Sequence, residues 1–419
     1  MRSSLHYVAA LAVASGCAGS PGAGASSDAG AVADASAETA PPDAGSEATP
    51  AADASVDTAV VWGSCPPMHW ESGMADAGYW LDGTLSLRPD GKVVVRGGNL
   101  YDPDADAWQR LPLTGDTDFL TSGATFTLLA DGRRVLIAGA GMDDPHGAHV
   151  VDTYSGEVRK VASMHAGRWR QLAALLPNGK VIVMGGQGDT AYAAAIGAEV
   201  YDPEADSWTE VPTPEFFLDE GIGATTTTLG DGNLFVTGAH ARDCGRTYIY
   251  DWRTKAFHVS APIPVALQPA ETVLAADGRV FLMGGNSCNP YAPDGFFGPT
   301  TKTFWFDPGT ESWTAGKHLL HARQVDMLAT RLPCGSFLVG GGSEAADPYG
   351  EFVTSFELYD PTRDEWTEPQ LPVLYYFQWT TGALLPLRDE RVLAAFGNLS
   401  DAPGFGGPGE RSLFLVPDR

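Results

Sequence analysis

The chain has 419 residues, a hydrophobic content of 44% and a formal net charge of −26 at pH 7. Such an excess of acidic groups repels phosphate backbones and anionic lipid surfaces, which argues against nucleic acid as a partner. The apolar run near the N-terminus is too short to cross a bilayer, and no later stretch qualifies.

Residues 1–17, "MRSSLHYVAALAVASGC", predict a secretory signal. They combine a basic residue, a short apolar run and small residues before Cys17. "ASGC" resembles a bacterial lipobox, in which Cys17 becomes the lipidated N-terminus, although Ala14 stands where Leu is usual. An ordinary cleaved signal is the alternative. Ala18 and Gly19 lack the Asp that signals inner-membrane retention in related lipoproteins, so the resemblance favours an outer-membrane lipoprotein, facing the periplasm or the cell surface, and otherwise a secreted protein.

Residues 18–57 consist almost entirely of Ala, Gly, Ser, Pro, Thr, Asp and Glu, without Lys, Arg or an aromatic residue. Such a composition cannot bury enough apolar surface to become ordered, so it predicts a disordered tether. The tether would hold the following domain, residues 58–419, away from a membrane that the protein touches only through its lipid.

A short aromatic and turn motif recurs at intervals of roughly fifty residues. Asp-Pro followed by small and acidic residues favours a turn, and the flanking Tyr and Trp favour half-buried strands. A second element, an Asp-Gly or Asn-Gly turn, a β-branched run and paired Gly, precedes each copy, as in "PNGKVIVMGG" at 177–186. The clear copies of the aromatic motif are "YDPDADAW" (101–108), "YDPEADSW" (201–208), "FDPGTESW" (306–313) and "YDPTRDEW" (359–366), with weaker copies at 151–158 and 250–257.

These elements resemble the kelch repeat, whose marks are paired Gly after the second strand and spaced Tyr and Trp. Four short strands per repeat and seven copies of the Gly element predict an all-β, seven-bladed kelch-type β-propeller over 58–419. The Gly residues suit close backbone approach, and the Tyr and Trp rings would pack between blades. We therefore assign these residues structural roles.

The aromatic motif occurs six times against seven copies of the Gly element, which indicates how the ring closes. After the last Gly element the chain supplies a third strand but no Trp strand. The segment "TAVVW" at 58–62 is a short β-branched run, so it is predicted to pair with 412–416 as the outer strand of the seventh blade. The alternative is that it belongs to the linker.

The five cysteines suit an exported protein. With Cys17 assigned to the lipid, Cys244 and Cys288 follow the Gly elements of neighbouring repeats and are predicted to form a disulfide. Cys65 and Cys334 are expected on opposite faces and are left without an assigned pairing.

The turns of both motifs are predicted to lie on one face of the propeller and the long irregular loops on the other. Binding residues gather on variable loops held by a rigid scaffold. "HAGRWRQL" (165–172) and "HARQVDML" (321–328) align at a constant offset of 156, which matches His165 with His321 and Arg168 with Gln324. Aromatic rings with convergent polar groups suit sugars or an acidic peptide, whereas the alternative is that the rings only pack the loops down. The candidate ligand-binding residues on this loop face are His165, Arg168, Arg170, Gln268, Tyr291, Phe296, His321, Arg323, Tyr349 and Tyr376.

The sequence offers weak grounds for two kinds of catalytic or metal chemistry. Galactose oxidase and its relatives share this propeller and use a Tyr-His pair, a Cys–Tyr crosslink and a His from a trailing domain. This sequence has no Tyr-His dipeptide, reads "YYFQW" at the corresponding entry and ends with the seventh repeat, so copper oxidase activity is not expected. Asp143, Asp144, His146 and His149 are a weak metal candidate on one loop, since the spacing is more typical of a polar loop.

The sequence predicts a monomeric, non-catalytic recognition module without a cofactor. Its partner is expected to be a protein or a glycan bound on the loop face. The competing hypothesis is a carbohydrate-active, oxidase-like enzyme, which rests on fold analogy alone.

Overall fold

A computed structural model describes residues 65–66, 68–76, 85–95, 99–117, 123–140, 144–188, 197–214, 224–238, 245–268, 271–288, 296–324, 327–344, 353, 355–369, 382–396 and 411–417. These residues lie within one compact unit, Asp57–Arg419, and form antiparallel sheets without helices. Within the described part of the chain, no helix has the length and apolar character needed to cross a membrane. The predicted signal (1–17) and tether (18–57) lie outside the described residues.

The first four sheets follow one another along the chain and are numbered here from the N-terminal side. Sheet 1 contains β2 (Leu85–Leu87), β3 (Val93–Val95), β4 (Asn99–Asp102) and β5 (Ala107–Arg110). Sheet 2 contains β7 (Thr125–Leu128), β8 (Arg134–Ala140), β9 (Asp144–Asp152), β10 (Glu157–Lys160) and a parallel fifth strand, β6 (Thr114–Gly115). Sheet 3 contains β11 (Leu172–Leu175), β12 (Val181–Met184), β13 (Ala198–Asp202) and β14 (Ser207–Val211). Sheet 4 contains β15 (Thr225–Thr228), β16 (Leu234–Thr237), β17 (Thr247–Asp251) and β18 (Ala256–Val259).

Three further sheets and a small one complete the described structure. Sheet 5 contains β20 (Glu271–Leu274), β21 (Val280–Met283), β24 (Thr303–Asp307) and β25 (Ser312–Ala315). Sheet 6 contains β26 (Met327–Arg331), β27 (Phe337–Gly341), β28 (Phe356–Asp360) and β29 (Glu365–Thr367). Sheet 7 contains β30 (Gly382–Pro386), β31 (Val392–Phe396), β32 (Arg411–Pro417) and β1 (Met68–Asp76). The small sheet joins β19 (Leu267–Gln268), β22 (Asn286–Cys288) and β23 (Phe296–Pro299).

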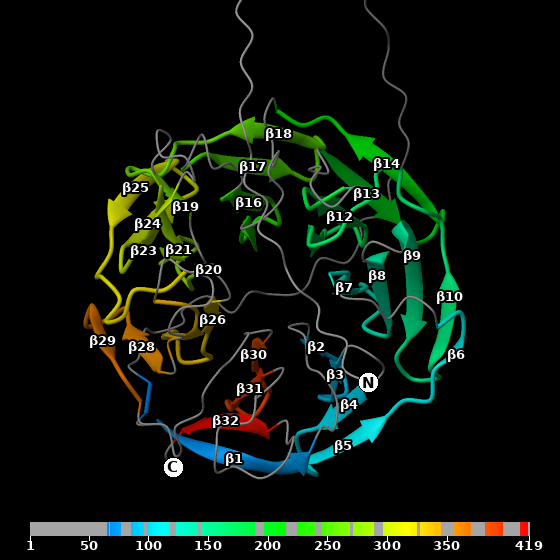
Figure 1. Ribbon diagram of the computed structural model, residues 1–419, viewed down its shortest axis with the longest axis horizontal. Coiled ribbons are helices and arrows are strands. Elements are labelled where there is room, and N and C mark those ends of the chain that lie inside the picture. The colour runs from blue at the N-terminus through cyan, green and yellow to red at the C-terminus, as the bar shows by residue number, and fades with distance from the viewer. Residues whose placement is uncertain are drawn as a thin grey trace, which may run out of the picture. The chain divides into compact units, whose positions relative to one another are not determined.

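The larger sheets follow one another around a ring, with the first strand of sheets 1 to 6, and β30 of sheet 7, nearest the centre (Figure 1). Contacts between these innermost strands link sheet 7 to sheet 1 on one side and to sheet 6 on the other. A hydrogen bond from Arg88 to the carbonyl oxygen of Thr153, at 2.7 Å, joins sheets 1 and 2. All-β architecture built from repeated four-stranded antiparallel sheets is therefore confirmed.

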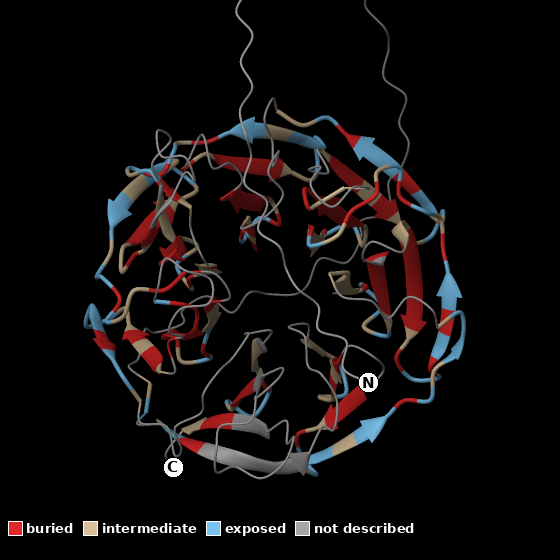
Figure 2. Cartoon of the chain, in the orientation of Figure 1, coloured by how far each residue is buried: buried red, intermediate tan, exposed pale blue. Residues whose placement is uncertain are grey.

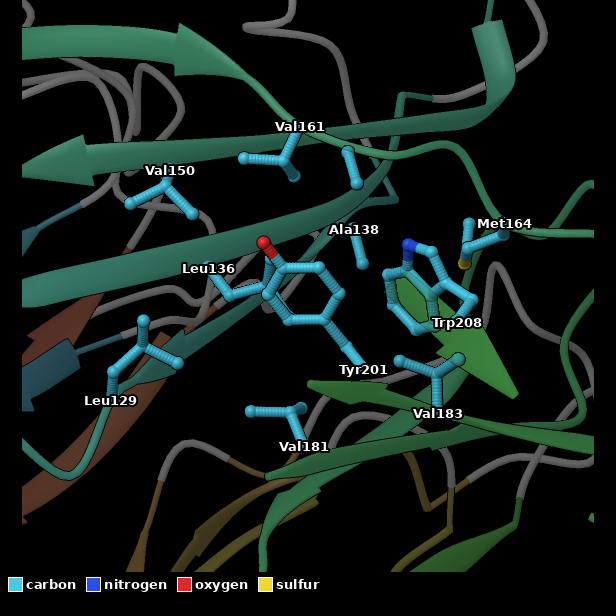
Figure 3. Close-up of a cluster of buried hydrophobic side chains, with 11 residues drawn as sticks. Leu129, Leu136, Ala138, Val150, Val161, Met164, Val181, Val183, Tyr201 and Trp208 are labelled. Atoms are coloured by element: carbon cyan, nitrogen blue, oxygen red, sulfur yellow. The ribbon is translucent and has the colours of Figure 1, made fainter. Parts of the chain in front are cut away.

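The hydrophobic core lies between neighbouring sheets. The second strands are almost fully buried, whereas most residues of the fourth strands are exposed, apart from the second residue of each (Figure 2). Between sheets 2 and 3, Tyr201 and Trp208 pack against valines and leucines from both sheets (Figure 3). The Tyr and Trp of the repeated motif are thus core residues, and each burial contributes about 1.5–3 kcal/mol or more relative to exposure.

The repeated turn follows from its own side chains. In the 201–208 turn, Asp202 Oδ1 accepts hydrogen bonds from the backbone N–H groups of Glu204 and Ala205. Asp206 has a φ of 48°, a conformation that Asp tolerates, and its carboxylate accepts a 2.9 Å hydrogen bond from the Tyr201 hydroxyl. Equivalent tyrosine–aspartate bonds recur in sheets 1 and 6, which explains why the motif repeats with this spacing.

The strand that completes sheet 7 is not the one predicted from the sequence. β1 pairs with β32 so that Trp70 lies opposite Leu415, and β31 occupies the other edge of β32. Pairing of 58–62 with 412–416 is therefore wrong, and 58–62 lies outside the described residues. The β-branched run at 58–62 was the stronger strand signal. Trp70, however, is buried against Phe356 at 4.6 Å, and its core packing outweighs that propensity.

A disulfide joins Cys65 to Cys334, with their Cα atoms 5.2 Å apart. The expectation that these residues lie on opposite faces is wrong. That expectation depended on a closing strand that ended before Cys65. In the structure β1 begins after Cys65, and Cys65, Met68 and Cys334 pack against the same core cluster. For the predicted Cys244–Cys288 bond, Cys244 and the side chain of Cys288 lie outside the described structure.

Candidate ligand-binding site

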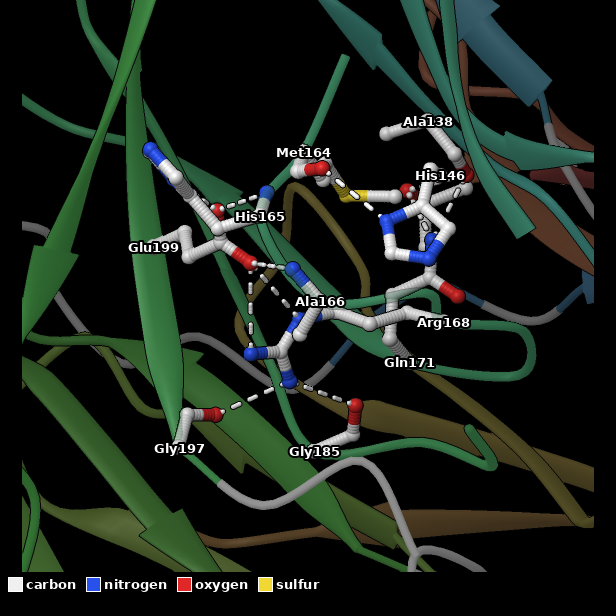
Figure 4. A network of polar contacts seen from close by, with 11 residues as sticks. Ala138, His146, Met164, His165, Ala166, Arg168, Gln171, Gly185, Gly197 and Glu199 are labelled. Atoms are coloured by element: carbon white, nitrogen blue, oxygen red, sulfur yellow. Dashed lines mark hydrogen bonds and ion pairs between the residues drawn. The ribbon is translucent and has the colours of Figure 1, made fainter. Parts of the chain in front are cut away.

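The segment that leads into β11 is fixed by a buried ion pair. Arg168 is 1% exposed and donates to Glu199 Oε1 at 3.4 Å and to the carbonyl oxygens of Gly185 and Gly197 at 3.0 Å (Figure 4). Burial disfavours the ionised form of Glu199. Hydrogen bonds from the backbone of Ala166 and from the backbone and ring of His165 outweigh it, so the pKa of Glu199 lies below its usual range.

Sheet 6 carries the same arrangement at the start of β26. Arg323 is fully buried and donates to Glu357 Oε1 at 2.9 Å, to Gly341 O at 2.6 Å and to Ser355. Glu357 also accepts from the backbone N–H groups of Leu320 and His321. Burial lowers the pKa of the Arg323 guanidinium, and Glu357 opposes that effect.

These contacts correct the alignment of 165–172 with 321–328, and they bear on two of the predicted binding residues. Arg168 is equivalent to Arg323 rather than Gln324. Ala166 is equivalent to His321, because their backbone N–H groups donate to the corresponding glutamate carboxylates. The offset of 156 holds from β11 to the paired Gly but is 155 before β11. Both arginine side chains are buried and bonded within the fold, so the structure gives them a stabilising role, and their predicted ligand binding stays a prediction.

The two candidate histidines and Arg170 lie nearer to solvent. His165 Nδ1 contacts Glu199 Oε2 at 2.9 Å. His321 lies 3.6 Å from Glu344 and 3.7 Å from Glu368. Arg170 has a φ of 55° and its guanidinium lies 5.2 Å from the centre of the Trp169 ring. Arg170 is therefore the predicted residue that is both exposed and adjacent to an aromatic face.

Three side chains beside Arg170 leave buried polar atoms without a hydrogen-bond partner among the described residues: Trp169 Nε1, Gln171 Oε1 and Gln187 Oε1. Trp169 and Gln187 are direct partners in an antiparallel bridge. The Gln171 amide is fixed by donating to Ala138 O at 2.6 Å and to Thr125 at 3.3 Å. This group, termed the amide cluster, faces sheet 2 and was not singled out from the sequence.

An unpaired buried polar group costs about 1–3 kcal/mol, so such groups are rare and need an explanation. The amide cluster holds one unused donor and two unused acceptors, which lie on the bridged pair and on Gln171. A hydroxyl or an amide from a ligand could satisfy these atoms. The sequence signal that could have found the cluster is the run of polar residues at 168–171 just before an otherwise apolar strand.

A carboxyl group occupies the equivalent end of another inner strand. Glu271 begins β20 on the same side as Val273, which packs in the core between sheets 5 and 6. Burial raises the pKa of Glu271 to about 8, opposed by a hydrogen bond from Thr272 N. Three residues before Glu271, the predicted site residue Gln268 donates a hydrogen bond to Gly238 O at 3.4 Å. Glu271 was not predicted, because one Glu at a strand start carries no distinctive pattern.

The structure describes none of the four predicted aromatic side chains. Tyr291, Tyr349 and Tyr376 lie outside the described residues, as does the side chain of Phe296 in β23. Their predicted roles stay predictions.

The weak metal candidate is dispersed. Asp144, His146 and His149 lie in strand β9, not on a loop, and Asp143 lies outside the described residues. Asp144 pairs with Lys160 at 3.1 Å, His146 Nδ1 contacts Met164 O at 3.1 Å, and His149 lies 3.5 Å from Asp116. Among the described residues, no group of three His, Cys, Asp or Glu side chains is placed to hold a metal ion.

Comparisons with known proteins agree with this architecture. Residues 168–215 match the kelch motif. The chain is 24% identical over 267 residues to kelch-like protein 35 of Mus musculus, 28% identical over 156 residues to a kelch-like protein of Aspergillus terreus, and 33% identical over 124 residues to an F-box/kelch-repeat protein of Arabidopsis thaliana. These matches cover 62%, 34% and 27% of the chain but only 41%, 33% and 32% of the relatives.

A solved structure shares the fold at low sequence identity. It is described as a novel fungal alcohol oxidase of the AA5 family in complex with copper, with a TM-score of 0.58 and 18% identity over 84% of this chain and 71% of that one. The repeat matches, the relatives and the all-β sheets together support a kelch-repeat propeller.

Proposed function

We propose that the protein is a seven-bladed, non-catalytic recognition module that binds a protein or carbohydrate partner on its loop face. Kelch-repeat proteins generally mediate protein interactions, which favours a binding role. The observation that carries the proposal is the amide cluster, because its one donor and two acceptors are buried and unused. A ligand rich in hydroxyl or amide groups would satisfy them once the groups that cover these buried atoms move aside, while Arg168 keeps the backbone of the segment in place.

Arrays of neutral glycans and of extended peptides, probed with the purified protein, test this proposal. We expect a ligand whose affinity falls by about tenfold or more in Gln171→Leu and Gln187→Leu, corresponding to about 1.4 kcal/mol. Gln109→Leu, at an exposed position of β5, is the matched control and should bind normally. A ligand bound equally by all three variants would place recognition elsewhere, and circular dichroism of each variant excludes misfolding.

A second candidate function is oxidation of an alcohol or carbohydrate. It is favoured by the shared fold of the copper-containing alcohol oxidase. The sequence, which lacks a Tyr-His dipeptide, argues against it here. Copper-loaded protein should release no peroxide above background with primary alcohols or galactose, and sustained release would favour the enzyme.

We also propose that the module is exported and anchored through Cys17. The support is the pattern of residues 1–17 and the Cys65–Cys334 disulfide, since disulfides persist in oxidising compartments. Cys17→Ser should abolish lipid labelling and release the protein from membranes. A mutant that still enters the detergent phase would refute the anchor, and it would leave binding on the loop face untouched.

A further inference from the structure

A groove of about 430 Å³ lies between sheets 5 and 6, apart from the amide cluster. Its lining includes Trp305, Tyr359, Arg279, Gly316, Lys317 and Asp364. This volume is within the range of small-molecule sites.

The corresponding interface between sheets 2 and 3 shows why the groove is open. In both places a Trp indole donates to a backbone carbonyl across the interface: Trp208 to Ala162 at 2.7 Å, and Trp366 to Lys317 at 2.8 Å. When the two interfaces are aligned on these bonds, Thr314 is equivalent to Arg159 and Lys317 is equivalent to Ala162.

These replacements change the hydrogen-bond and ion-pair partners of the aspartate that ends the repeated turn. Asp206 accepts a hydrogen bond from Ala162 N at 3.0 Å and lies 3.5 Å from the Arg159 guanidinium. Asp364, its counterpart, accepts the Tyr359 hydroxyl at 2.7 Å, and among the described residues no cation pairs with it. Thr314 is too short to reach as Arg159 does, so one carboxylate oxygen remains open to the groove.

The two cationic side chains of the groove also have few partners among the described residues. The Arg279 guanidinium lies 4.5 Å from the centre of the Trp305 ring and bonds only Asp277 among the described residues. Its counterpart between sheets 7 and 1, Arg391, bonds Asp389 and also spans the interface to Pro103 O at 2.8 Å. Lys317 has its backbone oxygen fixed by Thr303 and Trp366, while its ammonium makes no ion pair within the described structure.

We infer that this groove binds a small molecule carrying a carboxylate together with neighbouring hydrogen-bond donors, of the size of an amino acid or an acidic monosaccharide. The carboxylate would accept from Lys317 and from the free N–H groups of Arg279. Hydroxyl or ammonium donors of the same molecule would bond Asp364. The ligand needs both its carboxylate and its donors, because within the described structure the groove presents an unpaired ammonium and an unpaired carboxylate together.

Isothermal titration of the full chain with four probes tests this inference. Glucuronate and alanine carry a carboxylate and donors, acetate carries only the carboxylate, and glucose carries only hydroxyl groups. We expect glucuronate or alanine to bind, whichever donor type fits, at least about tenfold more tightly than acetate and glucose. Equal binding of acetate or glucose, or binding of no probe, would overturn the inference.

Paired variants locate the site. Lys317→Ala and Asp364→Asn should each weaken the preferred probe by about tenfold. Asn tolerates the φ of 53° at position 364, so the turn is retained. Asp206→Asn makes the same change at the closed interface and should leave affinity unchanged. Unaltered binding in Lys317→Ala, or an equal loss in Asp206→Asn, contradicts this groove as the site. None of these variants touches the amide cluster, so the loop-face proposal can fail independently.

Discussion

At the scale of single residues, the two buried arginine–glutamate pairs differ most from what the sequence suggested. Arg168 and Arg323 occupy positions at the entry to an inner strand, where convergent polar residues predict binding. Their guanidinium groups instead satisfy backbone carbonyls inside the fold. A sequence shows that an arginine is present but not which way it points, and the partner glutamates lie 31 and 34 residues away.

Breaking one of these pairs should destabilise the protein strongly. Arg323→Ala leaves Glu357 buried without its cation, so we expect a loss of about 3–5 kcal/mol in the free energy of unfolding. Arg133→Ala, which removes an exposed pair with Asp152, should cost about 0–1 kcal/mol. Urea denaturation of both variants measures the difference, and similar losses would mean that Arg323 contributes no more than a surface residue.

The pH dependence of stability should report on Glu271. Burial raises its pKa to about 8 in the folded protein, from an ordinary value of 4.5. The folded state therefore binds the proton more tightly than the unfolded state, so this stabilisation is complete below about pH 4.5 and is lost as the pH rises through about 8. Every tenfold difference in proton affinity between the two states corresponds to about 1.4 kcal/mol.

Glu271→Gln removes that titration. Its melting temperature should fall less than that of the wild type between about pH 5 and about pH 9, because only the wild type loses a bound proton's stabilisation over that range. Parallel pH profiles for the two proteins would show that the pKa of Glu271 is not raised in the folded protein. The comparison also isolates Glu271 from Glu199, whose lowered pKa acts in the opposite sense at acidic pH.

At the scale of elements, repetition made the sheets predictable. The Asp-Gly turns, the buried second strands and the Tyr–Trp turns each recur, and the local chemistry of one copy supports the others. Elements without copies were not predictable. β1 has no repeat to align with, and its residues "MHWESGMAD" alternate poorly between apolar and polar. The partner strand, not local propensity, fixes it in place.

Trp70 should be the residue that anchors β1. It is 6% exposed and packs against Phe356 of sheet 6. Trp70→Ala should cost about 3–5 kcal/mol through the lost contacts and the cavity left behind. Thr209→Ala, at an exposed position of the outer strand β14, should change stability by no more than about 0.5 kcal/mol. Chemical denaturation that gives equal midpoints for the two variants would show that β1 packs some other way.

At the scale of the whole molecule, the Cys65–Cys334 disulfide ties the segment before β1 to the turn between β26 and β27. It closes a loop with a sequence separation of 269 residues. Removing it with Cys65→Ala and Cys334→Ala together should lower stability by about 2–5 kcal/mol. Thermal unfolding of the double variant, compared with the wild type with and without reductant, gives the measurement. A wild type that melts identically in both conditions would show that the bond contributes nothing.

Pairing of β1 with β32 also dictates an order of events during biosynthesis. β1 leaves the ribosome early, but its partner strand β32 follows only after the strands of the six other sheets have been made. At about 5–20 residues per second, the 269 residues between the two cysteines alone take on the order of ten seconds or more. Throughout that interval Trp70 and Cys65 are exposed without their partners. The nascent chain is thus most vulnerable to misassembly, to non-native thiol pairing and to proteolysis before β32 emerges, and a chaperone that shields residues 65–76 would act at that stage.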